Sequence, residues 1–455
     1  MEGFGLPARG RLGYTGCHER APRPCLSSMS GIVHIIGAGM AGLACATELV
    51  GRGGRRVVLH EAAVQAGGRC RSYHDDVLGR MIDNGNHLIL GANPALFHYL
   101  DTIGARARLT CPDAAIFPFV DLRTGERWTV RPNRGRLPWW IFSPARRIPG
   151  TIWSDYLSGI RLAFAPKSAT VASALRGARR PIVERLFEPL TVAVLNTSIE
   201  EGAASLLWPV MRLTFGAGEA ACRPYFARHG LGPDLVQPGI AYLKSQGAEV
   251  RLGVRLRRLE FDQNSVRALD FGNDNFALGH DDYLVLAVPP SVAADLVPGL
   301  KAPLETRAIV NAHFLLNEPV TLPEDSGLVG VVGGTAQWIF ARGHVVSVTV
   351  SAADALAERS ADDIAALIWT DVAIALDRRN EPMPPHRVVK EKRATFAQTP
   401  AMLGLRAPTQ GHHANLLFAG DWTDTGLPAT IEGAVHSGQK AARHLISRPR
   451  PHPTQ

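Results

Sequence analysis

Two short hydrophobic runs near the N-terminus flank a glycine-rich turn and a stretch of helix-forming residues. Ile32–Ile36 is rich in β-branched residues, and Arg56–Leu59 begins a second run that ends at Glu61. The residues from Ala41 to about Val50 are mostly helix formers. This order predicts a strand, a tight turn, a helix and a second strand, the βαβ arrangement of a parallel sheet.

A similar pattern closes the chain. Leu416–Ala419 is a predicted strand, Gly420 and Asp421 form a turn, and a helix is predicted from about Ile431 to Leu445. Further predicted strands lie within residues 247–262 and 281–290. Segments distant in sequence are therefore expected to share one sheet.

Residues 81–91, MIDNGNHLILG, fit neither a half-buried strand nor a surface turn. Five polar or small residues, 83–87, stand between two apolar stretches instead of alternating with them. The pattern carries an acid, two amides and an imidazole toward the interior. We therefore treat this segment as a candidate for chemistry.

Length and composition narrow the possible classes. A chain of 455 residues with 46% hydrophobic and 20% charged residues is expected to fold into two domains or one large composite domain. The formal charge of +8 fits an anionic partner, such as a membrane surface or a phosphate-bearing cofactor, and also fits a solvated basic surface. No long Lys/Arg run is present, so no nucleic-acid partner is expected.

The six cysteines form no CxxC pair, which argues against a disulfide framework or a zinc site and favours a reducing compartment. Apart from residues 31–47, no stretch approaches the roughly 20 apolar residues of a membrane span. Residues 1–28 are rich in Gly, Pro and Arg and are predicted to be a disordered extension preceding a natural start at Met29.

The N-terminal turn has the spacing of a dinucleotide-binding site. Gly37 permits the tight turn, Gly39 lets the backbone approach a pyrophosphate, and Gly42 lets the helix pack closely on the strand. The helix then begins at Met40 and Ala41, and its free N–H groups face the phosphates. Glu61 stands where a carboxylate accepts hydrogen bonds from a ribose. The alternative is a glycine-rich packing turn.

GGRCRS (67–72) directly after Glu61, together with the C-terminal GDWTDTG, resembles the FAD-dependent amine oxidase and phytoene desaturase superfamily. The resemblance implies an α/β fold, in which discontinuous segments build a Rossmann-type FAD-binding domain beside an α+β substrate domain. It also implies contacts with FAD from Gly68, Arg69, Gly420 and Asp421. The helix N-terminus at Thr430 and Ile431 would face the flavin, and the Leu256 backbone would contact adenine.

The expected FAD-binding domain comprises residues 29–95, 215–299 and 394–447, and the expected substrate domain comprises 96–214 and 300–393. Residues 448–455 are expected to form a disordered tail.

Four segments narrow the resemblance to the squalene-associated FAD-dependent desaturases, the hydroxysqualene dehydroxylase family. They are DNGNH (83–87), residues 187–207, ATFAQTP (394–400) and residues 420–438. The family usually carries DNGQH, so Asn86 is shorter by one methylene and keeps the amide. The implied activity is reductive removal of the allylic hydroxyl of hydroxysqualene, giving squalene. An isoprenoid hydrocarbon substrate and an unidentified electron donor follow from it.

This activity needs a proton donor beside an apolar channel. We expect Gly85 to let the segment approach the flavin, Asp83 or His87 to supply the proton, and Asn86 to orient a water or the hydroxyl. A purely structural role remains open for each: Asp83 as a cap of backbone N–H groups, and His87 as a core histidine. Asn196 either faces the substrate cavity or caps a helix.

LPWWIFSPARRIPG (137–150) places aromatic residues beside arginines, a composition typical of a membrane interface. A cytoplasmic protein bound peripherally to the inner face of the cell membrane is expected. The alternative is an aromatic cluster in the domain core.

Three other functions stay open. An amine oxidase usually has an aromatic residue where this chain has Thr430, and often a C-terminal cysteine, whereas no cysteine follows Cys222. A carotenoid desaturase would share both the cofactor and the substrate shape. A non-catalytic prenyl carrier of the same fold would bind no FAD.

Overall fold

The computed structural model describes residues 31–52 and 55–448. The predicted N-terminal extension lies outside these residues, as does the predicted C-terminal tail apart from Arg448.

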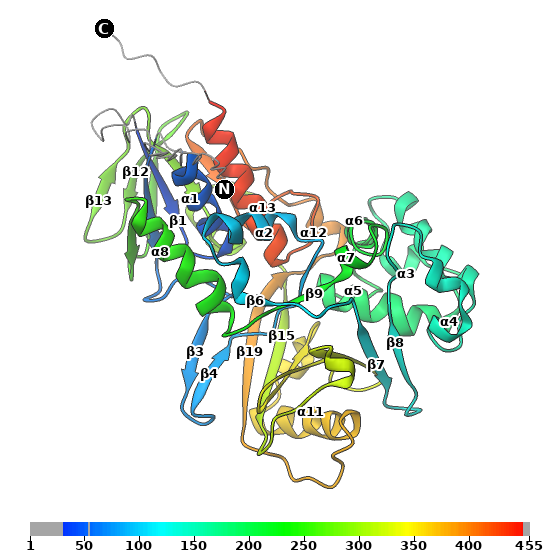
Figure 1. Cartoon of the computed structure of the whole chain (residues 1–455). Helices are drawn as coiled ribbons and strands as arrows, with labels where there is room; N and C mark the ends of the chain where they lie inside the picture. Colours follow the sequence, from blue (N-terminus) through cyan, green and yellow to red (C-terminus); the bar gives the residue numbers. More distant parts are fainter. Residues whose placement is uncertain (1–30, 53–54, 449–455) are drawn as a thin grey trace, which may run out of the picture.

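A five-stranded parallel sheet is assembled from both ends of the chain and its middle (Figure 1). Its strands, in spatial order, are β10 (Glu249–Leu252), β2 (Arg56–Glu61), β1 (Ile32–Ile36), β14 (Tyr283–Leu286) and β20 (Leu416–Phe418). The central register pairs Ile35 with Leu59 on one side and with Val285 on the other. The predicted Rossmann-type sheet built from discontinuous segments is confirmed.

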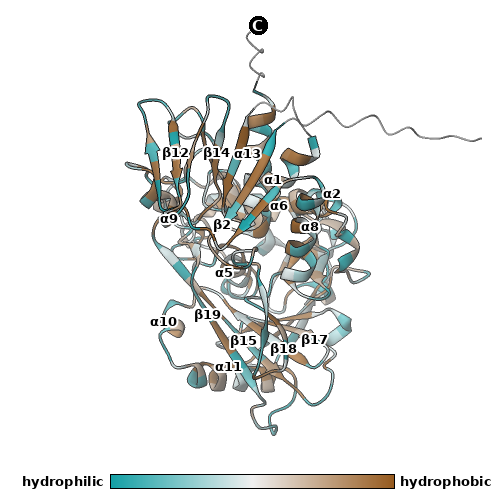
Figure 2. Cartoon of the chain, turned by 90° about the vertical axis from the view of Figure 1, so that its left-hand side faces the viewer, coloured by the Kyte–Doolittle hydropathy of each residue, from teal (hydrophilic) through white to brown (hydrophobic). Residues whose placement is uncertain are grey.

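Helices α1 (Met40–Arg52) and α13 (Ile431–Ile446) lie side by side against this sheet (Figures 1 and 2). They cross so closely that a Cβ at Gly438 would lie 2.1 Å from the Ala41 carbonyl oxygen. Helices α2 (Pro94–Thr102) and α8 (Gln237–Ser245) complete this layer. The apolar faces of all four helices share one core with the sheet.

A small antiparallel sheet covers the opposite side of the parallel sheet. It consists of β11 (Arg258–Phe261), β12 (Val266–Asp270) and β13 (Asn275–Ala277), with α9 (Pro290–Leu296) following β14. Phe271 and Phe276 pack here against a stacked pair of buried histidines, His34 and His60, whose ring centroids are 5.4 Å apart. The predicted strand segment 247–262 therefore forms two strands, of which β10 joins the parallel sheet and β11 joins the small antiparallel one.

A seven-stranded sheet forms the lower part of the molecule (Figure 1). Its strands, in order, are β19 (His386–Phe396), β15 (Thr306–Leu315), β18 (Val345–Val350), β17 (Trp338–Arg342), β16 (Leu328–Val332), β7 (Phe117–Asp121) and β8 (Arg127–Val130). Only β16 and β7 pair in parallel. Helix α11 (Ala361–Ala375) covers one face, where the alternate residues Val310, Ala312 and Phe314 are buried.

Short helices pack beyond β7 and β8, at the right of Figure 1. They are the 3-10 helices η3 (Trp139–Phe142), η4 (Pro144–Arg146) and η5 (Trp153–Phe164), α3 (Val171–Ala174), α4 (Arg180–Ile182), the π-helix η6 (Val183–Phe187), α5 (Glu188–Leu195), α6 (Ala204–Leu213) and α7 (Glu219–Cys222). Their buried side chains form one apolar cluster with Phe119, Trp128 and Val332 of the sheet.

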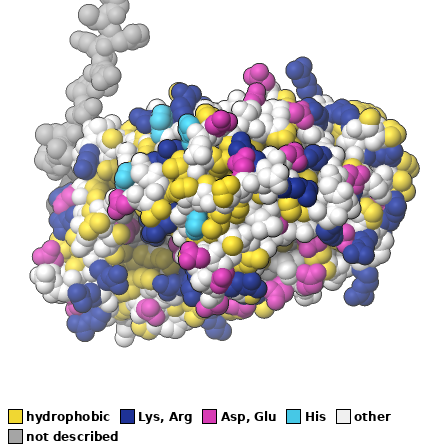
Figure 3. All heavy atoms as spheres, turned by 90° about the horizontal axis from the view of Figure 1, so that it is seen from below, with side chains coloured by type: hydrophobic (Ala, Val, Ile, Leu, Met, Phe, Trp, Pro, Cys, Tyr) yellow, Lys and Arg dark blue, Asp and Glu magenta, His cyan; other side chains and the backbone are white. Residues whose placement is uncertain are grey.

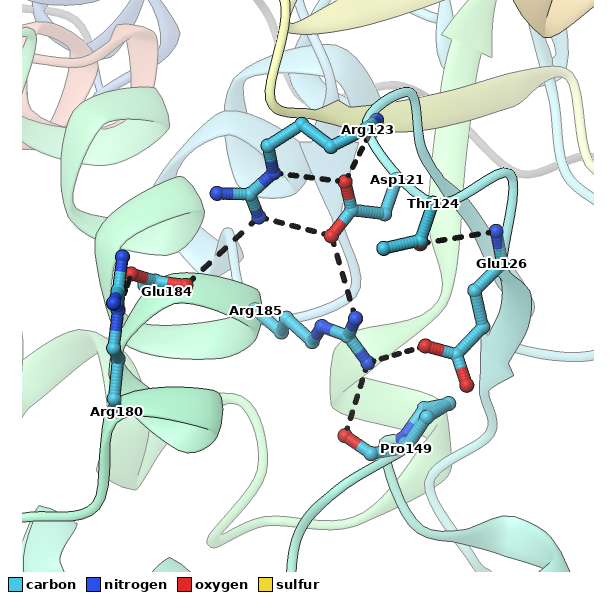
Figure 4. A network of polar contacts seen from close by, with 8 residues as sticks. All are labelled: Asp121, Arg123, Thr124, Glu126, Pro149, Arg180, Glu184 and Arg185. Atoms are coloured by element: carbon cyan, nitrogen blue, oxygen red, sulfur yellow. Dashed lines mark hydrogen bonds and ion pairs between the residues drawn. The ribbon is translucent and has the colours of Figure 1, made fainter.

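A charged network fixes these helices to the β7–β8 hairpin (Figure 4). The buried Asp121 accepts two hydrogen bonds from the Arg123 guanidinium, at 3.0 and 2.9 Å, which hold the pKa of Asp121 below its ordinary value. Arg185 of η6 reaches Asp121 at 3.3 Å and Glu126 at 2.7 Å. The apolar cluster is therefore anchored at its sheet edge.

The remaining elements join the two large sheets. They are the hairpin β3 (Ser72–Asp75) and β4 (Arg80–Asp83), the three-stranded sheet β5 (Ile89–Leu90), β9 (Pro224–Ala227) and β6 (Leu109–Thr110), the helical turns η2 (Arg106–Arg108), η8 (Pro323–Asp325), α10 (Asp354–Ala357) and α12 (Pro400–Leu403), and the π-helix η7 (Gly232–Val236). Helix α2 and strand β19 each cross a predicted domain boundary, and those boundaries stay predictions. Among residues 31–52 and 55–448, no helix is long and apolar enough to cross a bilayer.

Candidate active site

The three glycines of the N-terminal turn have three different surroundings. A Cβ at Gly37 would lie 2.3 Å from the Ala287 carbonyl oxygen, and one at Gly42 would lie 1.9 Å from that of Gly37. A Cβ at Gly39 would meet no atom within 4 Å, so this position faces open space at the start of α1. The turn thus leaves an opening where a pyrophosphate can reach the first N–H groups of the helix, from Met40 and Ala41 onward.

Glu61 stands at the end of β2 beside this opening. Its carboxylate accepts the Ala38 N–H at 2.7 Å and the Ala63 N–H at 2.9 Å. Each oxygen keeps a second lone pair, so the side chain can also accept a ribose hydroxyl. The segment after β10 lies alongside, because Val254 N–H donates to the Glu61 carbonyl oxygen at 2.8 Å. Leu256 follows with a buried side chain.

The 67–69 segment joins the N-terminal turn to the C-terminal one. Gly67 N–H donates to the Ala38 carbonyl oxygen at 2.8 Å, and a Cβ at Gly68 would lie 3.4 Å from the Cα of Gly39. Arg69 forms an ion pair with Asp421, with 2.8 Å between Nη1 and Oδ2. The Asp421 carboxylate raises the pKa of Arg69 above its ordinary value. The predicted cofactor residues from the two ends of the chain therefore meet.

Helix α13 contacts the turn that carries Asp421. The Thr430 hydroxyl caps it by accepting the Gly433 N–H at 3.1 Å, and Ile431 is its first residue. Gly420 N–H donates to the Ser437 hydroxyl at 3.0 Å, which fixes the turn that carries Asp421. Open space at Gly39, a flanking cation and two helix N-termini fit the phosphates and the flavin of FAD.

The polar segment 83–87 lies between this cofactor region and the seven-stranded sheet. Asn311 on β15 accepts the Asn86 N–H at 3.4 Å and donates to the Asn84 carbonyl oxygen at 3.4 Å. A Cβ at Gly85 would lie 3.0 Å from Asn311 Nδ2. A side chain at Gly85 would therefore crowd Asn311 on β15, a reason for glycine that is separate from the predicted approach to the flavin.

Asp83 is surrounded by hydrogen-bond donors. Its Oδ1 accepts the Ser72 hydroxyl at 2.5 Å and the Leu231 N–H at 2.8 Å, and its Oδ2 lies 3.5 Å from Arg342. The buried carboxylate thus binds the segment near residue 231 to the β3–β4 hairpin. This geometry favours the structural role that the sequence left open for Asp83.

His87 differs from Asp83 in having a free side chain. Its half-buried imidazole has no hydrogen-bond partner among the described residues. Burial lowers the pKa of His87 to about 4, with the Asp83 charge acting in the opposite direction and Arg69 in the same one. The ring is therefore neutral at pH 7 and lies close enough to Arg69 of the cofactor region to feel its charge.

Asn196 is a structural residue. It ends α5 in the left-handed conformation, accepts the Ala352 N–H at 2.6 Å and donates to the Thr395 hydroxyl at 3.0 Å. The side chain therefore ties α5 to β19 and to the residues that follow β18.

The residues that surround the polar segment 83–87 were not identified from the sequence. Asn311 and His313 alternate with buried apolar residues on β15, as Ser347 and Thr349 do on β18. His313 Nδ1 contacts the Ser347 hydroxyl at 2.8 Å, and burial lowers the pKa of His313 to about 4. On each of these strands, two polar residues at positions i and i+2 interrupt an otherwise apolar run. This pattern is the signal that could have revealed the polar face of the seven-stranded sheet.

One row of residues crosses this face of the sheet from polar to apolar. Cross-strand pairing gives the row in this spatial order: Asn311 on β15, Thr349 on β18, Trp338 on β17, Gly330 on β16, Phe119 on β7 and Trp128 on β8. Phe119 packs edge-on against Trp338 at 5.5 Å and stacks on Trp128 at 5.5 Å. Because Gly330 has no Cβ, the Phe119 ring lies over it. The polar segment thus adjoins an aromatic wall.

Comparison with known proteins shows the family. The profile described as flavin containing amine oxidoreductase matches residues 40–446. Hydroxysqualene dehydroxylase of Rhodopseudomonas palustris is 46% identical over 92% of this chain and 99% of its own, and that of Sinorhizobium fredii is 45% identical over 91% and 98%. The chain belongs to the hydroxysqualene dehydroxylase family.

This family lies within the flavin-containing amine oxidoreductases, so the chain is an FAD-dependent oxidoreductase and the expected cofactor is confirmed. Cyclohexylamine oxidase from Brevibacterium oxydans has the same fold, with a TM-score of 0.67 at 17% identity over 91% of this chain and 98% of that one. The 15-cis-phytoene desaturase of Glycine max is only 22% identical. Hydroxysqualene dehydroxylases are thus much nearer than carotenoid desaturases. The roles of the individual site residues stay predictions.

Proposed function

We propose that the protein removes the allylic hydroxyl of hydroxysqualene reductively and releases squalene. The observation that carries this proposal is the row across the seven-stranded sheet, which joins the polar segment 83–87 to an aromatic wall. A hydroxyl group would lie at the polar end of the row, and the hydrocarbon chain along its apolar end. The names of the curated relatives support the same substrate.

When bound, reduced flavin supplies the hydride that forms the new C–H bond, while the C–O bond breaks and the hydroxyl leaves as water with one added proton. An allylic carbon favours this route because the developing positive charge is delocalised. The chain must therefore deliver a proton to the hydroxyl oxygen and keep other water away from the reacting carbon.

His87 is the residue we assign to proton delivery. Its ring is unpartnered among the described residues and lies close to Arg69 of the cofactor region, whereas the Asp83 carboxylate is occupied by donors from Ser72, Leu231 and Arg342. Asn86 Nδ2 has only a long contact, 3.4 Å to the Thr349 hydroxyl, so its amide can turn to orient the substrate hydroxyl or a water.

The apolar end of the row excludes water. Phe119 and Trp128 are buried, and Trp338 is packed against the same cluster as the helices beyond β7 and β8. Aromatic side chains of this kind give a hydrocarbon a large contact area without offering it hydrogen bonds. The substrate chain is therefore held by burial, and only its hydroxyl by polar contacts.

We also propose that the protein works in the cytoplasm, peripherally bound to the inner face of the cell membrane, and receives electrons from a separate donor. A C30 hydrocarbon is almost insoluble in water, so the bilayer is its natural reservoir.

The direct test is anaerobic incubation of the FAD-loaded protein and reduced flavin with hydroxysqualene. We expect squalene as the product, and no conversion when phytoene replaces hydroxysqualene. In a separate assay with oxidised FAD-loaded protein and a quinone as electron acceptor, desaturation of phytoene, together with no conversion of hydroxysqualene under reducing conditions, would instead assign a carotenoid desaturase. A colourless protein that takes up no added FAD would indicate a prenyl carrier.

A further inference from the structure

The exposed apolar side chains of the molecule are concentrated in one short segment. Within residues 137–164, eight large hydrophobic side chains are exposed, against ten in the rest of the described chain. We call them the apolar patch; its members are Leu137, Trp139, Phe142, Ile152, Trp153, Leu157, Ile160 and Phe164. Phe164 is 84% exposed and Trp139 is 62% exposed. Soluble proteins rarely expose such a concentration without a partner.

Segment 137–164 has an exposed side, which carries the apolar patch, and a buried side. Trp140 and Ile141, predicted to belong either to a membrane interface or to the core, are buried in the apolar cluster, while their neighbours Trp139 and Phe142 are exposed. Phe142 lies 5.8 Å, centroid to centroid, from Trp153 of η5, so the two 3-10 segments present one continuous surface. The core interpretation therefore holds for Trp140 and Ile141, and the membrane interface stays a prediction for Trp139 and Phe142.

Positive charge surrounds the patch. Residues 134–180 contain nine Lys or Arg residues and a single acid, Asp155, which is buried and paired with Arg179. Among the described residues, the Arg161 side chain donates only to the Arg176 carbonyl oxygen, and the Arg146 side chain only to that of Arg131. At the right-hand end of Figure 3, hydrophobic side chains likewise lie at the surface among Lys and Arg side chains. The rim is therefore complementary to an anionic surface.

We propose that the apolar patch is a docking surface for an anionic lipid bilayer. Tryptophan and phenylalanine at a basic rim suit the boundary between headgroups and acyl chains. A second copy of this chain is a poor occupant, because a two-fold contact would bring two basic rims together. This inference rests on the proposed function. It adds an entry route for the hydrocarbon substrate.

The inner side of η5 packs into the apolar cluster of the neighbouring helices. On its inner side η5 buries Leu162, and a Cβ at Gly159 would lie 3.2 Å from the Phe187 ring. The same cluster contains Phe119 and Trp128, the apolar end of the row that leads to Asn311. A hydrocarbon that leaves the bilayer at the patch would therefore travel within one apolar cluster to the polar segment.

Flotation of the FAD-loaded protein with vesicles tests this proposal. We expect binding to phosphatidylcholine vesicles that contain phosphatidylglycerol and weaker binding to phosphatidylcholine alone. The variant Trp139→Ser/Phe164→Ser should bind both kinds less than one tenth as well as the wild type. Its control, Val77→Ser/Leu304→Ser, removes two apolar side chains elsewhere that are 60% and 55% exposed and should bind normally.

A charge variant, Arg134→Gln/Arg136→Gln, leaves the apolar side chains intact and should lose only the preference for anionic vesicles. We expect a loss of about fivefold for each basic side chain removed. Wild-type protein that stays with neither vesicle, or an apolar variant that binds like the wild type, would overturn the proposal. Wild-type dimers that the apolar variant converts to monomers would instead assign the patch to a subunit interface.

Vesicle binding needs no turnover, so it can succeed or fail independently of the proposed reaction. Flavin absorbance and melting temperature of each variant confirm that it is folded.

Discussion

Asp83 and His87 lie four residues apart in one polar segment, yet their surroundings give them different tasks. Asp83 is fixed by donors from three other segments, whereas the His87 ring has no partner in the described part of the chain. Sequence alone proposed both as proton donors because the residue types permit either. Only the contacts made by Ser72, Leu231 and Arg342, far apart in sequence, separate them.

Replacing His87 by Ala should lower the rate of dehydroxylation by about 10²–10⁴-fold, the usual contribution of a general acid. The flavin absorbance spectrum and FAD affinity should stay unchanged. Asp83→Asn should instead lower the melting temperature and leave most of the rate per folded molecule. A His87→Ala variant with the wild-type rate would place the proton donor elsewhere.

The pH dependence of the rate follows from the pKa of about 4 at His87. Above this value the protonated ring is the minor form, and its fraction falls tenfold for each unit by which the pH rises. When the chemical step limits turnover, the wild-type rate should therefore rise as the pH falls from 8 toward 6. The profile of His87→Ala should be flat over the same range, and two parallel profiles would contradict the assignment.

At the scale of helices and strands, the two ends of the chain could be predicted and the middle could not. Glycines and apolar runs mark β1, α1, β2, β20 and α13 locally, and the predicted bounds differ from the observed ones by at most two residues. The 3-10 helix η5 and the seven-stranded sheet have no such local signal. The sheet depends on pairing between distant segments: β15 pairs with β19, and β7 pairs with β16, where Phe119 and Gly330 are 211 residues apart.

The crossing of α1 and α13 gives a prediction about packing. Because a Cβ at Gly438 would lie 2.1 Å from the Ala41 carbonyl oxygen, Gly438→Ala must separate the two helices. We expect a loss of about 1–3 kcal/mol in the free energy of unfolding, measured by urea denaturation. Gly404→Ala is the matched control, since its Cβ would make only an ordinary contact at 3.4 Å. Equal stability of the two variants would contradict the close crossing.

At the scale of the whole molecule, the cofactor site exists only when both ends of the chain fold together. Arg69 and Asp421 are separated by 352 residues, and their ion pair spans the join at 2.8 Å. Asp421→Asn should therefore weaken FAD binding about tenfold or more in a titration of the apoprotein. Asp424→Asn, an exposed neighbour, should bind FAD like the wild type. Equal affinities would show that the pair does not support the cofactor.

Acid should destabilise the whole protein through the buried pair His34 and His60. Burial lowers their pKa values to about 4 and about 3, below the ordinary 6.5. Stability is therefore complete above pH 6.5 and is lost as the pH falls from 6.5 toward 4, since the unfolded chain binds protons that the folded one excludes.

Each of the two histidines contributes a slope of about 1.4 kcal/mol per pH unit over this range. Urea denaturation at several pH values measures the slope, which His34→Phe/His60→Phe should reduce. An unchanged slope in that variant would assign the acid sensitivity to other groups, such as His313.

The reaction itself is tested most directly by anaerobic turnover of hydroxysqualene with reduced flavin in deuterated water. Hydrogen on reduced flavin exchanges with solvent, so a hydride transfer should place one deuterium on the carbon that loses its hydroxyl. We expect squalene carrying that single deuterium, and its formation should slow sharply in His87→Ala. Squalene without deuterium, or no squalene at all, would contradict reductive dehydroxylation at this site.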